Sequence, residues 1–143
     1  MATRTAAERR EEARQAFDTF LKECPTSQLL ARISDKWVGL VIGALREAKD
    51  DGRESLRYSD LGRQIPGVSQ KMLTQTLRSL ERDGLVSRTV TPSVPVRVDY
   101  ALTRLGSDLA CLLSSVKRWA ENHFAEVHAN RATYDATQPE QAA

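Results

Sequence analysis

The sequence predicts a mainly α-helical domain that carries one small β-hairpin, an α+β fold. Over most of the chain, apolar residues recur every three or four positions, which is the spacing of amphipathic helices. Between residues 85 and 102 the pattern changes to two short runs rich in β-branched residues, on either side of Pro92 and Pro95. The chain has 143 residues, 41% hydrophobic and 28% charged, which suits one globular domain with a terminal arm.

The first third of the chain predicts two helices. From Ala6 to Lys22, sparse apolar residues recur among Glu and Arg residues, which predicts a helix with one apolar face. Cys24-Pro25 marks the start of the second helix, because proline is tolerated at the first helical position. Cys24 is then the N-cap. This second helix, extending to about Glu47, is the most apolar one, so we expect it at the centre of the core.

Two short helices separated by a tight turn are expected next. Ser59 is a candidate N-cap for a helix of about two turns, and Pro66-Gly67 forms the turn. Ser69 caps the following helix, which runs to about Asp83 and stops at Gly84.

The remaining residues predict a hairpin and a long helix. The runs Leu85–Thr91 and Val98–Leu102 form the hairpin, and Thr103 caps a last helix that reaches about His128. Trp37 and Trp119 lie on apolar stripes and are expected in the core.

The predicted order of elements is that of a winged helix-turn-helix. It reads helix, helix, short strand, helix, turn, helix, β-hairpin, helix. We divide the chain into an N-terminal dimerisation helix over residues 1–23, a winged helix-turn-helix domain with a C-terminal dimerisation helix over 24–128, and a disordered tail over 129–143.

Basic charge is concentrated in the middle of the chain. The formal net charge is only +2, but residues 57–97 carry seven basic and three acidic side chains. The segment before them is neutral and the segment after them is net acidic. A local excess of this kind suggests a polyanionic partner.

The helix that begins at Ser69 separates apolar from basic residues. At about 100° per residue, Leu73, Leu77 and Leu80 share one side. An arc of about 60° on the opposite side holds three cations and an amide and no acid, namely Lys71, Gln75, Arg78 and Arg82. A plain solvated face usually mixes charges, since opposite charges one turn apart stabilise a helix.

These side chains suit double-stranded DNA. Lys and Arg bind phosphates, Gln and Arg match base edges in the major groove, and helix-turn-helix proteins place the start of such a helix there. Arg88 and Arg97 flank the hairpin tip, as a wing that contacts the neighbouring backbone or minor groove would require. The candidate DNA-binding residues are Ser69, Gln70, Lys71, Thr74, Gln75, Arg78, Arg88 and Arg97. A merely solvated basic face is the plainer alternative.

The chain closely resembles the HxlR-type regulators, which are winged-helix bacterial transcription factors related to the MarR group. The resemblance covers about residues 24–120. The motifs that carry it are, in chain order, Cys24-Pro25, Ser34–Trp37, Leu56–Gly67, Ser69–Val86 and Thr91–Gly106. The loop Lys49–Ser55 departs from the pattern, because it is several residues longer than the family's turn.

The resemblance implies a homodimer that binds a palindromic operator near its own gene. In this family the N- and C-terminal helices build the dimer. The residues favour the same arrangement, because the apolar faces of helices 6–22 and 103–128 exceed what one small core needs. The alternative is that the stripe Leu105–Trp119 only completes the core of its own chain.

The signal that such a regulator would answer stays open. Some HxlR-type proteins sense oxidants, quinones or aldehydes through a cysteine placed like Cys24, and a helix N-terminus favours the reactive thiolate. If Cys24 reacts, Cys111 is a less favoured candidate for its resolving partner; the alternative is that Cys24 is an inert, buried thiol. A small-molecule effector bound without covalent chemistry is the other alternative.

Other functional classes are less well supported. His123 and His128 are five residues apart and do not converge on a metal, and nucleotide-binding and hydrolase motifs are absent from the sequence, so no enzyme, metal or cofactor is expected. A protein-interaction module that lost DNA binding would not need the basic residues. The apolar run Trp37–Leu45 is too short for a membrane span, no signal peptide is recognised, and two cysteines suit a reducing, cytoplasmic location.

Overall fold

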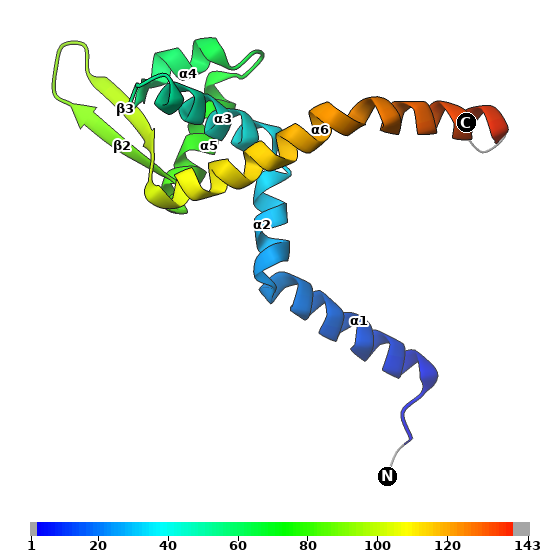
Figure 1. The fold of residues 1–143 in the computed structure, drawn as a ribbon. Coiled ribbons are helices and arrows are strands. Elements are labelled where there is room, and N and C mark those ends of the chain that lie inside the picture. The colour runs from blue at the N-terminus through cyan, green and yellow to red at the C-terminus, as the bar shows by residue number, and fades with distance from the viewer. Residues whose placement is uncertain (1–2, 139–143) are drawn as a thin grey trace.

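A computed structural model describes residues 3–138 of the chain. Its elements in chain order are α1 (Ala6–Glu23), α2 (Pro25–Ile33), α3 (Lys36–Asp50), β1 (Leu56–Arg57), α4 (Tyr58–Gln64), α5 (Gln70–Arg82), β2 (Val86–Thr91), β3 (Arg97–Leu102) and α6 (Arg104–Thr137). Figure 1 shows a body made of α3, α4, α5, the small sheet and the start of α6. The predicted mainly α-helical fold with a β-hairpin wing is confirmed.

The core is formed where α3, α4 and α5 meet the sheet. The largest side chains that are almost fully buried are Val41, Ile42, Leu56, Leu61, Leu73, Leu77 and Leu80. Burying apolar side chains of this size stabilises the folded chain by about 1.5–3 kcal/mol each, which is why these three helices pack together.

The sheet has three antiparallel strands in the order β1-β3-β2, and β2 with β3 forms the wing. Val86 pairs with Leu102 and Arg88 with Tyr100, so the register is fixed over the whole hairpin. Val86 and Tyr100 turn into the core and tie the base of the wing to it. The wing itself projects from the body (Figure 1).

Several helix ends lie where the sequence predicts them. The hydroxyl of Ser69 accepts a hydrogen bond from the amide of Met72, and Thr103 caps α6 through the amide of Gly106. Gly84 follows α5 with φ of 75°, a left-handed conformation that glycine adopts without strain. Cys24 is the N-cap of α2.

Two predicted boundaries are wrong. The expected single helix from Pro25 to Glu47 is interrupted, because the side chain of Asp35 accepts from the amide of Trp37 and starts α3 as a separate helix. A capping carboxylate competes with the helical backbone for the same amide group. Ser59 is not the cap of α4, which begins two residues earlier than predicted, at Tyr58 with Arg57 as the N-cap.

The C-terminal helix is longer than predicted. α6 continues to Thr137, so the expectation of a disordered tail over 129–143 is wrong for residues 129–137. This stretch has no strong apolar periodicity but also no proline or glycine to end a helix. Gln138 is the C-cap of α6, and the rest of the predicted tail, residues 139–143, lies outside the described residues.

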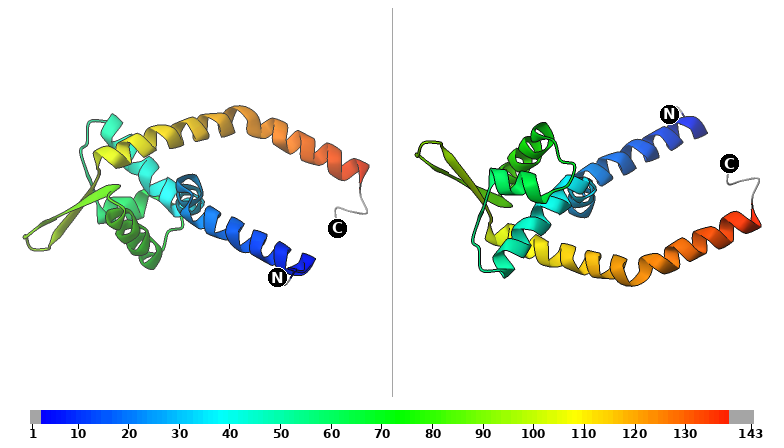
Figure 2. Two further views of the ribbon diagram at one scale, coloured as in Figure 1. Left: turned by 90° about the horizontal axis from the view of Figure 1, so that it is seen from below. Right: turned by 90° about the horizontal axis from the view of Figure 1, so that it is seen from above.

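Two arms extend from the body. Figure 2 shows α1 and the outer half of α6 running away from it, each without a neighbour along most of its length. Among the described residues, α1 buries none of its own and packs mainly on α2, the next helix. Trp119 on α6 is 56% exposed, so its predicted place in the core is wrong.

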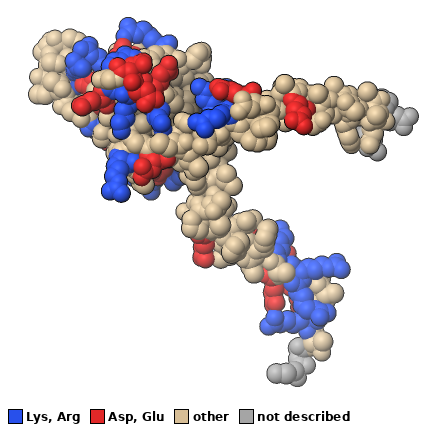
Figure 3. All heavy atoms as spheres, in the orientation of Figure 1, with Lys and Arg blue, Asp and Glu red and all other residues tan. Residues whose placement is uncertain are grey.

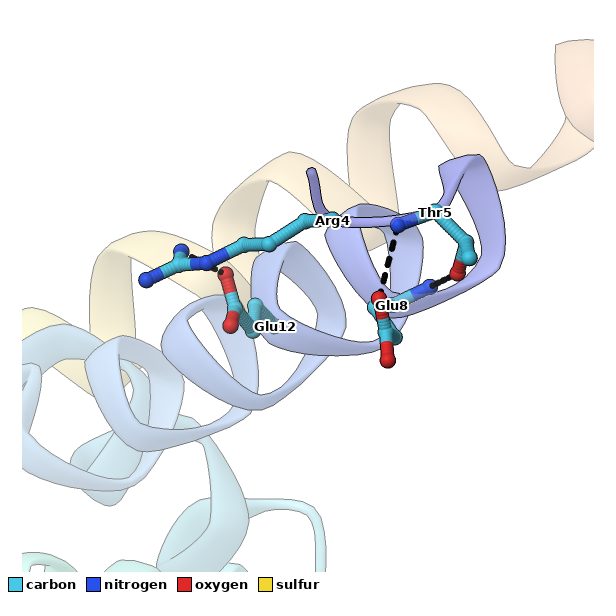
Figure 4. A network of polar contacts seen from close by, with 4 residues as sticks. All are labelled: Arg4, Thr5, Glu8 and Glu12. Carbon is cyan, nitrogen blue, oxygen red and sulfur yellow. Dashed lines mark hydrogen bonds and ion pairs between the residues drawn. The ribbon is translucent and has the colours of Figure 1, made fainter. Parts of the chain in front are cut away.

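The free end of α1 is stabilised by local polar contacts. The hydroxyl of Thr5 accepts from the amide of Glu8, and the Glu8 carboxylate accepts from the amide of Thr5, which forms a capping box (Figure 4). Arg4 donates to Glu12 at 2.7 Å. Such exposed contacts stabilise a helix only modestly. α1 also has little of the packing against a core that usually stabilises a helix of this length.

The junction between the wing and α6 requires a glycine. A Cβ atom added at Gly106 would lie 1.9 Å from the carbonyl oxygen of Leu85, which also accepts a hydrogen bond from the amide of Thr103. The clash is with backbone, so no side chain can move aside to relieve it.

Replacing Gly106 with alanine is expected to lower the free energy of unfolding by about 1–3 kcal/mol, because the wing must shift away from α6. Urea unfolding measures the change. Gly43→Ala is the matched control: this exposed site in α3 has nothing within 4 Å of the added methyl group. It should raise stability by about 0.5–1 kcal/mol. Equal stability of Gly106→Ala and the original chain would contradict the close approach.

Candidate nucleic-acid interface

The basic arc of α5 (Lys71, Gln75, Arg78 and Arg82) faces away from the core. Leu73, Leu77 and Leu80 are each 1% exposed, whereas all four residues of the arc are exposed. The rotation of the helix is therefore the one that the sequence predicts. Lys71 and Gln75 lie near its N-terminus, and Arg78 and Arg82 near its C-terminus.

The start of α5 is tied to α4 by a tyrosine. The hydroxyl of Tyr58 donates to the carbonyl of Gln70 at 3.1 Å and lies 2.9 Å from the hydroxyl of Thr74. Thr74 is half-buried, so its hydroxyl is less available than the sequence analysis expects, while Ser69 and Gln70 are exposed. The hydroxyl of Ser69 serves the helix cap.

The two wing arginines point to opposite faces of the hairpin. Arg88 pairs with Tyr100, and Arg97 pairs with Thr91. Residues 88 and 91 of one strand are three apart, and side chains alternate along a strand. Arg88 contacts Glu81 of α5 at 3.2 Å, whereas Arg97 contacts Asp99 of its own strand at 2.8 Å. Only Arg88 is thus brought beside the basic arc.

A groove separates α5 from the wing. This wing groove has a volume of about 520 Å³ and is lined by Thr74, Arg78, Glu81, Arg82, Arg88 and Tyr100. Three arginines and one glutamate give it a formal charge of +2. The candidates predicted from sequence omit Arg82, Glu81 and Tyr100. Tyr100 cannot be found from sequence alone, because only the hairpin register shows that it lies opposite Arg88.

Charged side chains are unevenly distributed over the molecule. Figure 3 shows them over the body and at the free end of α1, with acidic atoms also at the joint between α1 and α2, while much of the outer α6 is free of charge on this face. Exposed apolar side chains lie on α1, on α2 and along α6, namely Phe17, Phe20, Leu30, Leu112, Val116 and Trp119. These three helices thus offer apolar contact surface, which on α1 lies beside a charged free end.

Cys24 occupies the joint between the two N-terminal helices. It is the C-cap of α1 and the N-cap of α2, and its side chain is half-buried. The backbone amides of Ser27 and Thr26 lower the pKa of the Cys24 thiol, because they favour the negative thiolate, as expected at a helix N-terminus. Cys111 is exposed on α6, and its sulfur accepts a hydrogen bond from Arg46 at 2.9 Å.

Comparison with known proteins gives the family. The family model of the HxlR-like helix-turn-helix matches residues 32–128. The chain belongs to the HxlR-like helix-turn-helix family. Its relative in Escherichia coli, the HTH-type transcriptional regulator YtfH, is 39% identical over 112 residues, which cover 78% of this chain and 84% of the relative.

Solved structures of HxlR-like and MarR-type regulators have the same fold. Transcriptional regulator YtfH from Salmonella typhimurium is 36% identical, with a TM-score of 0.66 over 78% of this chain and 94% of that one. The redox regulator HypR in its reduced form is 31% identical, with a TM-score of 0.65 over 73% and 98% of the two chains.

The predicted family and the winged-helix fold are therefore confirmed, and the chain is a transcriptional regulator of the helix-turn-helix type. The matched relatives are named as transcriptional regulators and not as enzymes. Within residues 3–138, no helix combines the length and apolar character needed to cross a bilayer, and no cluster of residues suits a metal ion.

Cys24 is expected to react as a thiolate at lower pH than a free cysteine. In the Cys111→Ser variant, where only Cys24 can react, the rate of alkylation by iodoacetamide should reach half its maximum below the free-cysteine pKa of about 8.5. A midpoint at or above that of a cysteine peptide measured alongside would contradict the effect of the two amides.

Proposed function

We propose that this chain regulates transcription by binding a specific DNA sequence with α5 in the major groove. The observation that carries the proposal is the basic arc: three cations and an amide, all exposed, on the face of α5 opposite its buried leucines. Arginine and glutamine match guanine and adenine edges in the major groove, and cations at the flanks neutralise phosphates.

The residues of α5 and the wing divide into two roles. We assign base contacts to Gln70, Lys71 and Gln75, because they are exposed near the start of α5, the part that helix-turn-helix proteins insert furthest. Arg78 and Arg88 contact the backbone, since they line the wing groove. Arg97 reaches DNA only if the wing lies edge-on, because it points to the other face.

The protein acts as a homodimer built from the two arms. No side chain of α1 is buried within the described chain, yet Phe17 and Phe20 are 59% and 63% exposed. Apolar patches of this extent are typical of interaction surfaces. A two-fold dimer would place two copies of α5 about one DNA turn apart, and a palindromic operator matches that symmetry.

The signal is proposed to be chemical modification of Cys24 by an oxidant or electrophile. Its lowered pKa and its place at the joint of α1 and α2 support this, because a change there would alter the direction of α1. HypR, which has the same fold, is named a redox regulator.

A non-covalent effector is the second candidate for the signal. A mainly apolar hollow of about 540 Å³ lies between α2, α5 and α6, with Leu29, Leu105 and Leu109 among its lining residues. Such hollows suit small apolar ligands, and this one is lined by α2 and the start of α6 as well as by α5, the proposed recognition helix. A protein-interaction module is less well supported, because it gives the basic arc no role.

The base-reading role of Gln75 is tested against the phosphate role of Arg88 by anisotropy titrations on operator and random DNA. Gln75→Ala should weaken operator binding by about 1–3 kcal/mol and leave random DNA unchanged. Arg88→Ala should weaken both equally. Arg46→Ala, which removes an arginine bonded to α6, is the control and should change neither. Equal losses on both DNAs for Gln75→Ala would count against the assignment.

Dimerisation through the arms is tested by light scattering after chromatography. Phe20→Glu and Trp119→Glu should each shift the protein from dimer to monomer at micromolar concentration, because a buried charge in an apolar interface is costly. Val94→Glu is the control: Val94 is fully exposed between the wing strands, outside the arms, and this variant should stay dimeric. Dimers of unchanged stability in both arm variants would overturn this interface.

A further inference from the structure

The wing groove contains a buried tyrosine whose hydroxyl has no role within the fold. Tyr100 is only 8% exposed, and its side chain lines the groove together with Arg78 and Arg88. Among residues 3–138, this hydroxyl is in no hydrogen bond, unlike that of Tyr58. The ring is buried, but the hydroxyl is not enclosed and opens onto the groove, so it is available to a ligand that binds there.

The hydroxyl of Tyr100 is a donor. Burial raises the pKa of this phenol, so it keeps its proton at neutral pH. The groove therefore presents a phenol hydroxyl and arginine guanidinium groups, all of which donate hydrogen bonds. A phosphate ester fits this set, because its oxygens accept several such bonds and its charge is neutralised by the arginines.

Glu81 is the one acceptor with a full charge in the groove. Its carboxylate accepts from Nε of Arg88 at 3.2 Å and 3.4 Å, and both side chains are about 40% exposed. This contact joins α5 to β2 in the absence of DNA. An exposed ion pair of this kind is weak, so a phosphate that enters the groove can replace the carboxylate.

We propose that one backbone phosphate of DNA binds in the wing groove, held by Arg78, Arg88 and the hydroxyl of Tyr100, and displaces Glu81 from Arg88. The inference rests on the proposed function, because it requires that α5 binds DNA. The groove adjoins the basic arc and shares Arg78 and Arg82 with it. A phosphate in this place would fix the distance between the recognition helix and the wing. Glu81 acts as an internal competitor that lowers affinity for every DNA sequence.

Two conservative variants test the proposal by anisotropy titration across a range of salt concentrations. Tyr100→Phe should weaken binding to operator and random DNA alike by about tenfold, the loss expected for one hydrogen bond to a charged group. Glu81→Gln should tighten binding to both by about threefold and steepen the dependence of log affinity on log salt by about one. Tyr134→Phe, an exposed tyrosine on α6, is the matched control and should have no effect.

Neutralising one DNA phosphate at a time identifies the phosphate that contacts Tyr100. Methylphosphonate placed at one backbone position at a time removes the charge of that phosphate. At one position in each half-site, Tyr100→Phe should cause no further loss, because both changes remove the same bond. Additive losses at every position would overturn the assignment of the groove.

The outcomes separate this inference from the proposed function. If the original chain binds DNA in a salt-sensitive way but Tyr100→Phe binds equally well, the phosphate site is wrong and the regulator stands. The same holds if Glu81→Gln weakens binding, since Glu81 then positions Arg88 instead of competing. If Tyr100→Phe binds DNA normally but loses thermal stabilisation by inorganic phosphate, the groove binds free phosphate and not DNA. If the original chain binds no DNA, both proposals fail.

Discussion

The burial of one face of α5 is the constraint on which the rest of the interface depends. Leu73, Leu77 and Leu80 pack against α3 and the sheet and fix the rotation of the helix about its axis. Because the helix has a fixed angular period, the basic arc can then face only solvent. The wing follows from the same core, since Val86 and Tyr100 hold its base against the body and bring Arg88 to the side of α5.

The arms differ from α5, because their apolar faces are not buried in a core within the described chain. Most of the stability of a helix in a protein comes from packing of its apolar face, and α1 packs mainly on α2, so a partner surface would stabilise it further. Association of two chains through the arms would supply that surface and set the separation of the two recognition helices together. Cys24 lies at the joint of α1 and α2, so the proposed chemical change there would act on the direction of α1.

Much of this arrangement is predictable from the sequence, since capping residues and helical periodicity are local signals. Ser69, Thr103 and Gly84 end or begin helices as expected, and the basic arc has the predicted orientation. The errors arise where contacts between distant parts of the chain determine whether a side chain is buried. Trp119 lies on the outer part of an apolar stripe whose Leu109 packs against the core, and among the described residues Trp119 itself stays exposed; sequence periodicity cannot distinguish a core from an interface. The wing groove depends on strand register, which pairs Tyr100 with Arg88 and which no single segment encodes.

The salt dependence of DNA binding tests the central claim most directly. If three or four basic groups of each subunit reach phosphates, log affinity of the dimer should fall with log salt at a slope of roughly −5 to −7. The measurement is an anisotropy titration on the DNA that flanks the chain's own gene, repeated at several salt concentrations. A slope of this size would support DNA contact through α5 and the wing. A slope near zero, or no binding, would contradict it.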